Sequence, residues 1–300
     1  MGAAAMLEIL VRPADTMVPA ARLAVDLSEH LADLVVAALI EEVTLTPKPG
    51  LVDIRSRGAH RDLSWDLMCD SAWALHPTFR AMAVAGQTIE DPQKLRESIG
   101  RIGRNGETAM MQATGGINTH RGAIWALGLL VTAAAQDSNT LAPAAMVSRA
   151  AALARRHDRF APATTGNKGE RACREYGVGG ARAQAQAGFP HVIDIALPCL
   201  EQSRRRGDSE NSARLNALLS VIAELDDTCI LSRGGAAALS AVQSGALQIL
   251  DAGGAGSRRG KTALQQYEQE LLARHVSPGG AADLLAATLF LDKIRTAFTY

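Results

Sequence analysis

The sequence is poor in aromatic residues and in cysteine, and it carries no net charge. Aromatic residues make up 4% of the 300 residues, so the core must consist mainly of small aliphatic side chains. The four cysteines have no CxxC spacing, which indicates reduced thiols rather than a disulfide framework. Because 31 basic residues balance 31 acidic ones, no field of the whole chain attracts nucleic acid. Any anion site must therefore be local.

Long hydrophobic runs are also absent. The longest uncharged run, residues 234–250, contains glycine, serine and glutamine and is shorter than the ~20 residues that cross a bilayer. No basic region precedes the apolar stretch at the N-terminus, which argues against a secretory signal. We therefore expect a cytoplasmic protein without a membrane crossing.

Alanine is abundant, which favours helices. The chain has 55 alanines against 29 valines plus isoleucines, and leucine stripes over 27–39 and 215–225 follow a helical period. No β-branched runs alternate with these segments, as a parallel sheet would require. We predict an all-α domain over 23–300 after an N-terminal extension over 1–22. Further helices are expected over 67–85, 93–112, 121–136, 144–157, 181–187, 236–250, 261–275 and 281–296, and a solvated loop over 202–212.

Five Gly-Gly pairs each precede a segment that is predicted to be helical. They stand at 115–116, 179–180, 234–235, 253–254 and 279–280. A helix N-terminus has free N–H groups and a partial positive charge, and glycine lets a phosphate approach that backbone closely. Several such ends could hold a polyphosphate. Each pair alone could equally end a helix or form a turn.

Basic side chains stand next to these glycines. His120 and Arg121 fall in the first turn of a predicted helix, where a positive charge opposes the helix dipole unless an anion is bound. Asn118 and Thr119 are candidate caps of the same helix. Prolines on both sides of Lys48 exclude a helix there, so we expect a rigid loop that presents its ammonium group. A plain surface turn is the alternative.

Carboxylates supply the other half of a nucleotide site. Glu42 lies near Lys48, Glu107 precedes the 115–116 pair and Asp283 follows the 279–280 pair, while Asp66 and Asp70 lie one helical turn apart. Hard oxygen ligands of this kind suit Mg²⁺, usually together with phosphate oxygens. The sequence therefore implies magnesium, although each carboxylate alone could be a surface charge or a helix cap. The seven histidines lack paired-ligand spacing, which argues against zinc.

One basic segment resembles a phosphate-binding loop of nucleotide hydrolases. Residues 255–262 match a relaxed form of that motif, with Ala255 in place of the first glycine and with Lys261 at the lysine position. Such a loop needs a preceding strand inside a βα sheet. Residues 247–250 are the one candidate strand, and they fit the end of a helix better.

Several motifs, in order, resemble those of the triphosphoribosyl-dephospho-CoA synthases. They are residues 42–53 (EVTLTPKPGLVD), 106–107 with 114–122 (TGGINTHRG), 179–182 (GGAR), 227–228 with 233–235 (RGG), and 277–285 (SPGGAADLL). The resemblance covers about residues 30–292. It implies an enzyme in which the 2′-hydroxyl of 3′-dephospho-CoA displaces adenine from ATP and takes the triphosphoribosyl group. A carrier-protein transferase would use the product to modify an acyl carrier subunit of malonate decarboxylase or citrate lyase.

The resemblance also implies roles for individual residues. Glu107 and Asp66 are the candidates for catalytic carboxylates at an oxocarbenium-like transition state, and Glu42, Asp70 and Asp283 are the candidates for holding Mg²⁺. The residues expected to bind the nucleotide and its phosphates are Lys48, Gly115, Gly116, Asn118, Thr119, His120, Arg121, Arg233, Gly234, Gly235, Gly279 and Gly280.

The sequence departs from the family pattern at a few positions. Ala281 replaces a usual serine, Arg121 stands where lysine is common, and Cys229 occupies a position where a polar residue is expected. None of these changes removes a carboxylate or a glycine. The arginine- and alanine-rich composition and a chain without a fused second domain favour the malonate decarboxylase branch.

Two other classes of function remain as alternatives. One is a non-catalytic helical scaffold that binds CoA or the carrier subunit, and the other is an ATP hydrolase that uses the Lys261 loop. The sequence leaves the assembly open, and a homodimer is one candidate.

Overall fold

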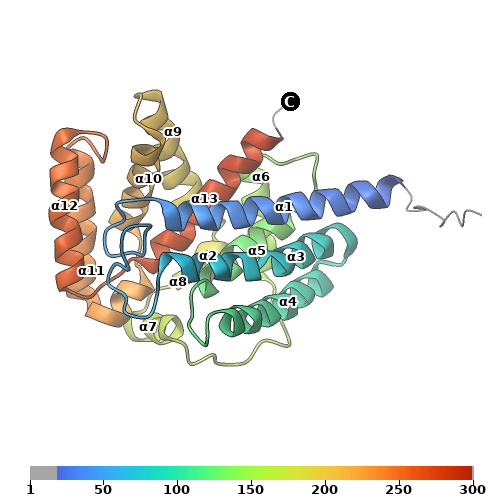
Figure 1. The fold of residues 1–300 in the computed structure, drawn as a ribbon. Coiled ribbons are helices and arrows are strands. Elements are labelled where there is room, and N and C mark those ends of the chain that lie inside the picture. Colours follow the sequence, from blue (N-terminus) through green and yellow to red (C-terminus); the bar gives the residue numbers. More distant parts are fainter. Residues whose placement is uncertain (1–18, 299–300) are drawn as a thin grey trace, which may run out of the picture.

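The computed structural model describes residues 19–298, with side chains described from residue 27 onward. All regular structure in this range is helical, without a strand, which confirms the predicted all-α fold (Figure 1). None of the helices in this part of the chain combines the length and the hydropathy needed to span a membrane. The predicted domain boundary at residue 22 falls inside α1, and residues 1–18 of the predicted extension lie outside the described residues.

The helices have the following bounds: α1 Pro19–Thr44, α2 Trp65–Ala74, α3 His76–Thr88, α4 Pro92–Ala113, α5 Arg121–Gln136, α6 Pro143–Arg155, α7 Lys168–Tyr176, α8 Gly180–Gln186, a π-helical segment His191–Ala196, α9 Leu197–Arg205, α10 Glu210–Glu224, α11 Thr228–Asp251, α12 Arg258–Ala273 and α13 Gly279–Ala297.

Helix α5 forms the centre of the core. It is buried from Ala123 to Ala135 apart from Trp125, and it packs against α1, α3, α4, α6 and α13. Figure 1 shows α11 and α12 as a pair of neighbouring helices at one end of the molecule. Small side chains let the central helices approach closely, which explains how a chain with few aromatic residues fills its core.

The contact between α3 and α5 depends on a missing side chain. A Cβ atom added at Gly86 would lie 2.5 Å from the backbone oxygen of Thr132. We predict that Gly86→Ala lowers the free energy of unfolding by ~1–3 kcal/mol through overpacking. Gly103→Ala in α4 is the matched control, because its Cβ would meet no backbone atom, only the flexible end of Met82 at 3.3 Å and Ile124 Cγ2 at 3.8 Å. Urea unfolding measures both variants, and equal stability would contradict the proposed tight packing.

One sequence-based prediction about the helices is wrong in detail. The expected helix over 67–85 is divided into α2 and α3 at Leu75, which ends the first helix and begins the second. Pro77 lacks an N–H group and so cannot continue the hydrogen-bond ladder of α2. Gly234 and Gly235 lie within α11 at a kink where two helices join: Gly235 has a non-helical backbone with φ of 69°, and the pair precedes the second helix, as predicted for residues 236–250.

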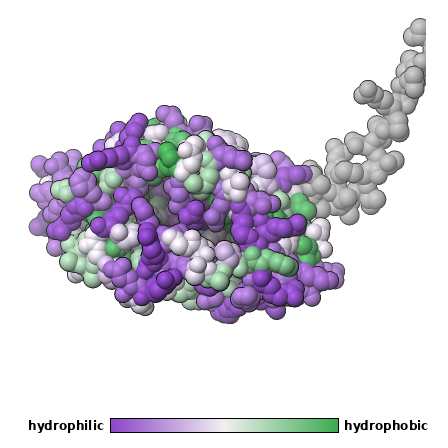
Figure 2. Space-filling view, turned by 90° about the horizontal axis from the view of Figure 1, so that it is seen from below, coloured by the Kyte–Doolittle hydropathy of each residue, from purple (hydrophilic) through white to green (hydrophobic). Residues whose placement is uncertain are grey.

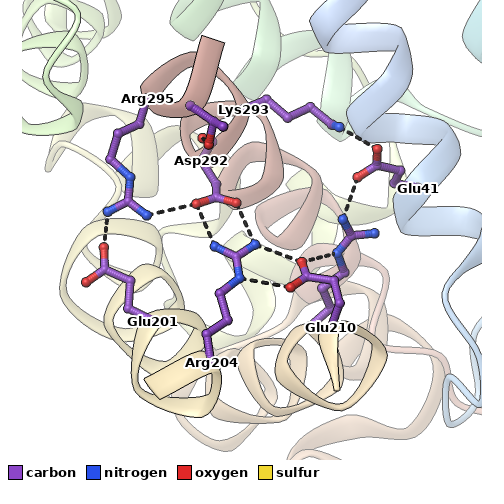
Figure 3. A network of polar contacts seen from close by, with 9 residues as sticks. Glu41, Glu201, Arg204, Glu210, Asp292, Lys293 and Arg295 are labelled. Carbon is purple, nitrogen blue, oxygen red and sulfur yellow. Dashed lines mark hydrogen bonds and ion pairs between the residues drawn. The ribbon is translucent and has the colours of Figure 1, made fainter. Parts of the chain in front are cut away.

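The predicted solvated loop over 202–212 is exposed as expected, but it is not a loop. Residues 202–205 belong to α9 and residues 210–212 to α10, so only a short turn remains between them. Figure 3 shows why the basic segment is ordered: Arg204 forms paired hydrogen bonds with Glu210 and with Asp292 of α13. Paired arginine–carboxylate contacts of this kind fix geometry as well as charge. The segment therefore joins three helices, while most of its residues are exposed to solvent.

Candidate active site

The loop between α1 and α2 is organised by Asp53. Its carboxylate accepts hydrogen bonds from Thr46 Oγ1 at 2.7 Å, from the backbone N–H of Lys48 at 3.1 Å and from that of Arg55 at 2.8 Å. Burial raises the pKa of Asp53, but these hydrogen bonds outweigh it, so the pKa lies below its ordinary value. Asp53 therefore acts as an ionised anchor that turns the loop inward.

Lys48 lies inside the protein rather than at the tip of this loop. Its side chain is buried, and its Nζ atom donates to the carboxylate of Glu42, which is also buried. Burial raises the pKa of Glu42, and the nearby charge of Lys48 opposes that rise without cancelling it. The expected rigid loop exists, but it delivers the ammonium group to a buried carboxylate instead of presenting it to solvent.

Two predicted anion-binding helix ends already face a carboxylate of this chain. Asp227 caps α11 by accepting from Cys229 N at 2.7 Å, and it also accepts from Ala281 N, at the start of α13, at 3.0 Å. Asp283 lies against the start of α5 and accepts from Ala123 N. A Cβ atom at Gly122 would be 2.0 Å from the Asp283 carboxylate, so any other residue there would displace that carboxylate.

The carboxylates of Glu42 and Asp227 both act electrostatically on Asp283. Burial raises the pKa of Asp283 well above its usual value, and the charges of Glu42 and Asp227 add to the rise. Burial likewise raises the pKa of Asp227, although backbone N–H groups oppose this. Acidic side chains crowded in this way favour a bound cation, because a cation relieves their mutual repulsion. We call Glu42, Asp227 and Asp283 the acid cluster.

His120 caps the same end of α5 without a side-chain capping bond. Its Nδ1 atom lies 2.8 Å from Ser71 Oγ, which in turn lies 2.6 Å from Thr119 Oγ1. The Nε2 atom is buried and has no hydrogen-bond partner among the described residues. Burial, and next the charge of Lys48, lower the pKa of His120 to about 4. The imidazole is therefore neutral, whereas the sequence suggested a cation.

Glu107 and Arg121, which we assigned to catalysis and to phosphate binding, contact each other. Arg121 Nε lies 3.0 Å from Glu107 Oε2, and each side chain is about one-third exposed, at 35% and 38%. The backbone N–H of Arg121 donates to Asn118 Oδ1 at 3.3 Å, which matches the predicted capping role of Asn118. This ion pair joins α4 to the beginning of α5. It places both groups at the surface, next to the loop that contains Gly115 and Gly116.

The glycines of that loop are exposed and have positive φ angles, 64° for Gly115 and 89° for Gly116. No atom lies within 4 Å of a Cβ added at either position. The backbone conformation requires glycine, and the space beside it is open to a ligand. Seen from below in Figure 2, the surface of the molecule is mostly hydrophilic and is hollowed near its middle.

Asp66 and Asp70 do not join the acid cluster through any contact in the described structure. Both are exposed on α2, where Asp66 lies in the first turn and so complements the helix dipole. Burial raises the pKa of Cys69, and the charges of Asp66 and Asp70 raise it further. Water screens the repulsion between the two carboxylates, so the helix can carry this like-charged pair without a bound metal ion. Among residues 27–298, the one group of three closely spaced metal-type ligands is Glu29, Asp33 and His76, on α1 and α3.

His60, which the sequence analysis did not single out, contacts the predicted phosphate-binding residue Arg233. It lies between Arg233 of α11 and Ser277, just before α13, and it contacts both. Gly279 packs against Cys229, since a Cβ there would be 3.0 Å from its sulfur atom. No motif contains His60, and 217 positions separate it from Ser277 along the chain. Only the folded structure reveals this contact.

Known proteins resemble this chain over most of its length. The family model of ATP:dephospho-CoA triphosphoribosyl transferase matches residues 28–299. A probable 2-(5''-triphosphoribosyl)-3'-dephosphocoenzyme-A synthase of Pseudomonas savastanoi pv. phaseolicola is 54% identical over 275 residues, which cover 91% of this chain and 94% of that protein. The corresponding probable synthase of Azotobacter vinelandii is 55% identical over 269 residues, with 89% and 92% covered.

A third relative is the 2-(5''-triphosphoribosyl)-3'-dephosphocoenzyme-A synthase of Klebsiella pneumoniae. It is 53% identical over 264 residues, which cover 88% of this chain and 94% of that protein. No solved structure matches the chain significantly. The family match covers nearly all of the described helices and both helix ends at which the acid cluster lies. The chain therefore belongs to the ATP:dephospho-CoA triphosphoribosyl transferase family and is a transferase enzyme.

Proposed function

We propose that the protein joins the triphosphoribosyl group of ATP to the 2′-hydroxyl of 3′-dephospho-CoA and releases adenine. The bond between C1′ of the ATP ribose and N9 of adenine breaks, and adenine keeps the electron pair. The 2′-oxygen forms the new bond to C1′, and its proton passes first to a carboxylate and finally to adenine. The observation that carries this proposal is the acid cluster beside Lys48, at the starts of α5 and α13.

Magnesium fits this cluster in its chemistry. The donors are hard carboxylate oxygens, and Asp283 is half-buried at the start of α13, close to the charge of Glu42. We propose that Glu42 and Asp283 hold Mg²⁺, which would neutralise the triphosphate. Asp70 was a further candidate from the sequence, but it is exposed on α2. Removing Mg²⁺ should therefore weaken ATP binding in the wild-type protein.

The triphosphate would be held at the edge of this cluster. We assign it to Arg121, Arg233 and the backbone N–H groups near Gly115 and Gly279, with Lys48 and the neutral His120 beneath. Because the triphosphate is transferred intact, these groups have to position it and not activate water at phosphorus. Glu107 is our candidate for the carboxylate that accepts the proton, held by Arg121, and Asp66 is the second candidate. Asn118 and Thr119 would shape the loop.

The exposed arginines allow a direct test of the anion site. Arg121→Ala and Arg233→Ala should each weaken binding of MgATP by ~10- to 100-fold, since a charge-assisted hydrogen bond contributes ~1.5–3 kcal/mol. Titration calorimetry measures the affinity. Arg101→Ala removes an exposed arginine of α4 and serves as the control with unchanged affinity. Wild-type affinity in both test variants would remove these residues from the site.

Product analysis separates this proposal from the alternatives. The protein is incubated with ATP, Mg²⁺ and dephospho-CoA, and chromatography detects adenine and phosphate. Adenine without phosphate supports group transfer, phosphate without adenine supports a hydrolase, and neither product supports a binding scaffold. The hydrolase reading has little structural support, because the segment before Ala255 is the end of α11 and Ser257 caps α12.

We also propose that the product serves malonate decarboxylase rather than citrate lyase. The support is the arginine- and alanine-rich composition. Purified acyl carrier subunits of the two enzymes, each with its own carrier-protein transferase, can be offered the product. Faster modification of the malonate decarboxylase carrier is expected, and preference for the citrate lyase carrier would reverse the assignment.

A further inference from the structure

Most of the well-ordered arginine contacts in the described structure are made with carboxylates. In Figure 3, Arg204 and Arg295 are both bound to Asp292, and each has a further glutamate partner. Arg121 also contacts a carboxylate, that of Glu107, but only through its Nε atom. The carboxylates of Glu201, Glu210 and Asp292 neutralise Arg204 and Arg295, which hold helices together.

Arg233 is held differently. Its side chain is exposed, and its NH2 atom lies 3.3 Å from Nδ1 of His60. No carboxylate of residues 27–298 forms an ion pair with it. On the other side of the ring, His60 Nε2 lies 2.9 Å from Ser277 Oγ, and Ser277 is 1% exposed. The three residues come from the loop after α1, from α11 and from the segment before α13.

The chemistry of arginine determines the tautomer of His60. A guanidinium group can only donate hydrogen bonds, so Nδ1 must be the acceptor. The neutral ring then carries its hydrogen atom on Nε2 and donates it to Ser277 Oγ. Burial, together with the charges of Arg233 and Lys168 and against the opposing charge of Asp62, lowers the pKa of His60 to about 4. The ring is thus neutral at the pH of the cell.

A neutral partner leaves the charge of the guanidinium intact. A carboxylate in the place of His60 would also hold Arg233 but would cancel most of its charge. The charge of Arg233 acts at the Cys229 thiol, as do those of Asp227 and Asp283, so Arg233 lies near the acid cluster. An ordered and uncompensated guanidinium is suited to phosphate oxygens.

We propose that His60, anchored by Ser277, is a positioning residue that orients Arg233 and leaves its full charge available to a magnesium-bound polyphosphate. The inference rests on the proposed function, and it assigns a role at that site to a residue outside every motif of the sequence. His60 acts through Arg233 and makes no contact with the reacting atoms. The part of the substrates that Arg233 would bind with the help of His60 is the triphosphate, not adenine or pantetheine.

The test compares glutamine and glutamate at position 60, which differ in charge but not in reach, with alanine, which removes the contact. Inorganic triphosphate with Mg²⁺ is the probe, and titration calorimetry gives its affinity. His60→Gln can still accept from Arg233 and donate to Ser277, so we expect binding within about 3-fold of wild type. His60→Ala should weaken binding by about 2- to 10-fold, the effect of one neutral hydrogen bond. His60→Glu should weaken it by ~10- to 100-fold, as Arg233→Ala does.

The His60→Glu variant distinguishes a role of His60 in orienting Arg233 from a purely structural role in packing. If His60→Glu binds the probe as tightly as His60→Gln, and both melt at the wild-type temperature, the inference is wrong. The double variant His60→Ala/Arg233→Ala should bind no more weakly than Arg233→Ala alone, because His60 acts only through the arginine. Additive losses would contradict the inference. Failure of the proposed function is separate, because it would appear as probe binding without release of adenine from ATP.

Discussion

Asp283→Asn should reduce adenine release by ~100-fold or more while leaving the protein at least as stable as wild type. The amide keeps the shape and can still accept from Ala123 N at the start of α5. The amide lacks the negative charge with which Asp283 is proposed to bind Mg²⁺. Loss of a metal ligand removes several kcal/mol of charge stabilisation from the transition state. Relief of repulsion with Glu42 and Asp227 should raise the melting temperature or leave it unchanged. Initial rates at saturating ATP and calorimetric melting measure the two effects.

The control for this prediction is Asp226→Asn. Asp226 is exposed beside Asp227, so the same chemical change there should alter neither rate nor melting temperature. Glu107→Gln belongs in the same series, because general-base loss typically lowers rates by ~100- to 10,000-fold. If Asp283→Asn releases adenine at the wild-type rate, the acid cluster is not the metal site. If Glu107→Gln does so, Glu107 is not the proton acceptor.

Lys48→Met should destabilise the protein by ~3–5 kcal/mol, because it leaves the Glu42 carboxylate buried without its partner. The loss should be larger at pH 8 than at pH 5. Burial raises the pKa of Glu42 in the folded wild type, and loss of Lys48, which opposes that rise, should raise it further, so the folded variant keeps a proton that its unfolded state releases. Stability therefore falls as the pH rises above the unfolded pKa. Urea unfolding without divalent metal, at both pH values, measures the effect.

The double variant Lys48→Met/Glu42→Gln separates structure from function. Removing both charges should restore most of the stability, since no uncompensated charge remains buried. Adenine release should stay low, because the site has lost both its cation and a metal ligand. A double variant that is stable and fully active would show that the buried pair only supports the fold.

Much of the helical fold could be predicted from the sequence. The expected helix over 121–136 coincides with α5, and that over 93–112 differs from α4 by one residue at each end. Both have strong apolar faces and clear turn residues at their ends. Helix α7 was missed because its nine residues are mostly charged, with alanine at 172 as its one buried residue. Such a helix has no apolar stripe, and its position depends on packing against α11.

The site was predicted less completely than the fold. Motif glycines and acids led to Asp283 and Glu42, which the structure brings into electrostatic contact. Sequence could not show that Lys48 is buried, since prolines fix the backbone of a loop but not the direction in which it folds. The sequence also could not identify His60 or Ser71, because their hydrogen-bond partners, Ser277 and His120, lie far away along the chain. Single polar residues outside a motif carry no local signal of such contacts.

The fate of the γ-phosphate tests the central claim most directly. ATP labelled with ³²P at that position is incubated with the protein, Mg²⁺ and dephospho-CoA, and the label is followed by chromatography. Transfer of the intact triphosphoribosyl group predicts that the label moves onto dephospho-CoA in an amount equal to the adenine released. Label that appears as inorganic phosphate, without labelled dephospho-CoA, would contradict the account.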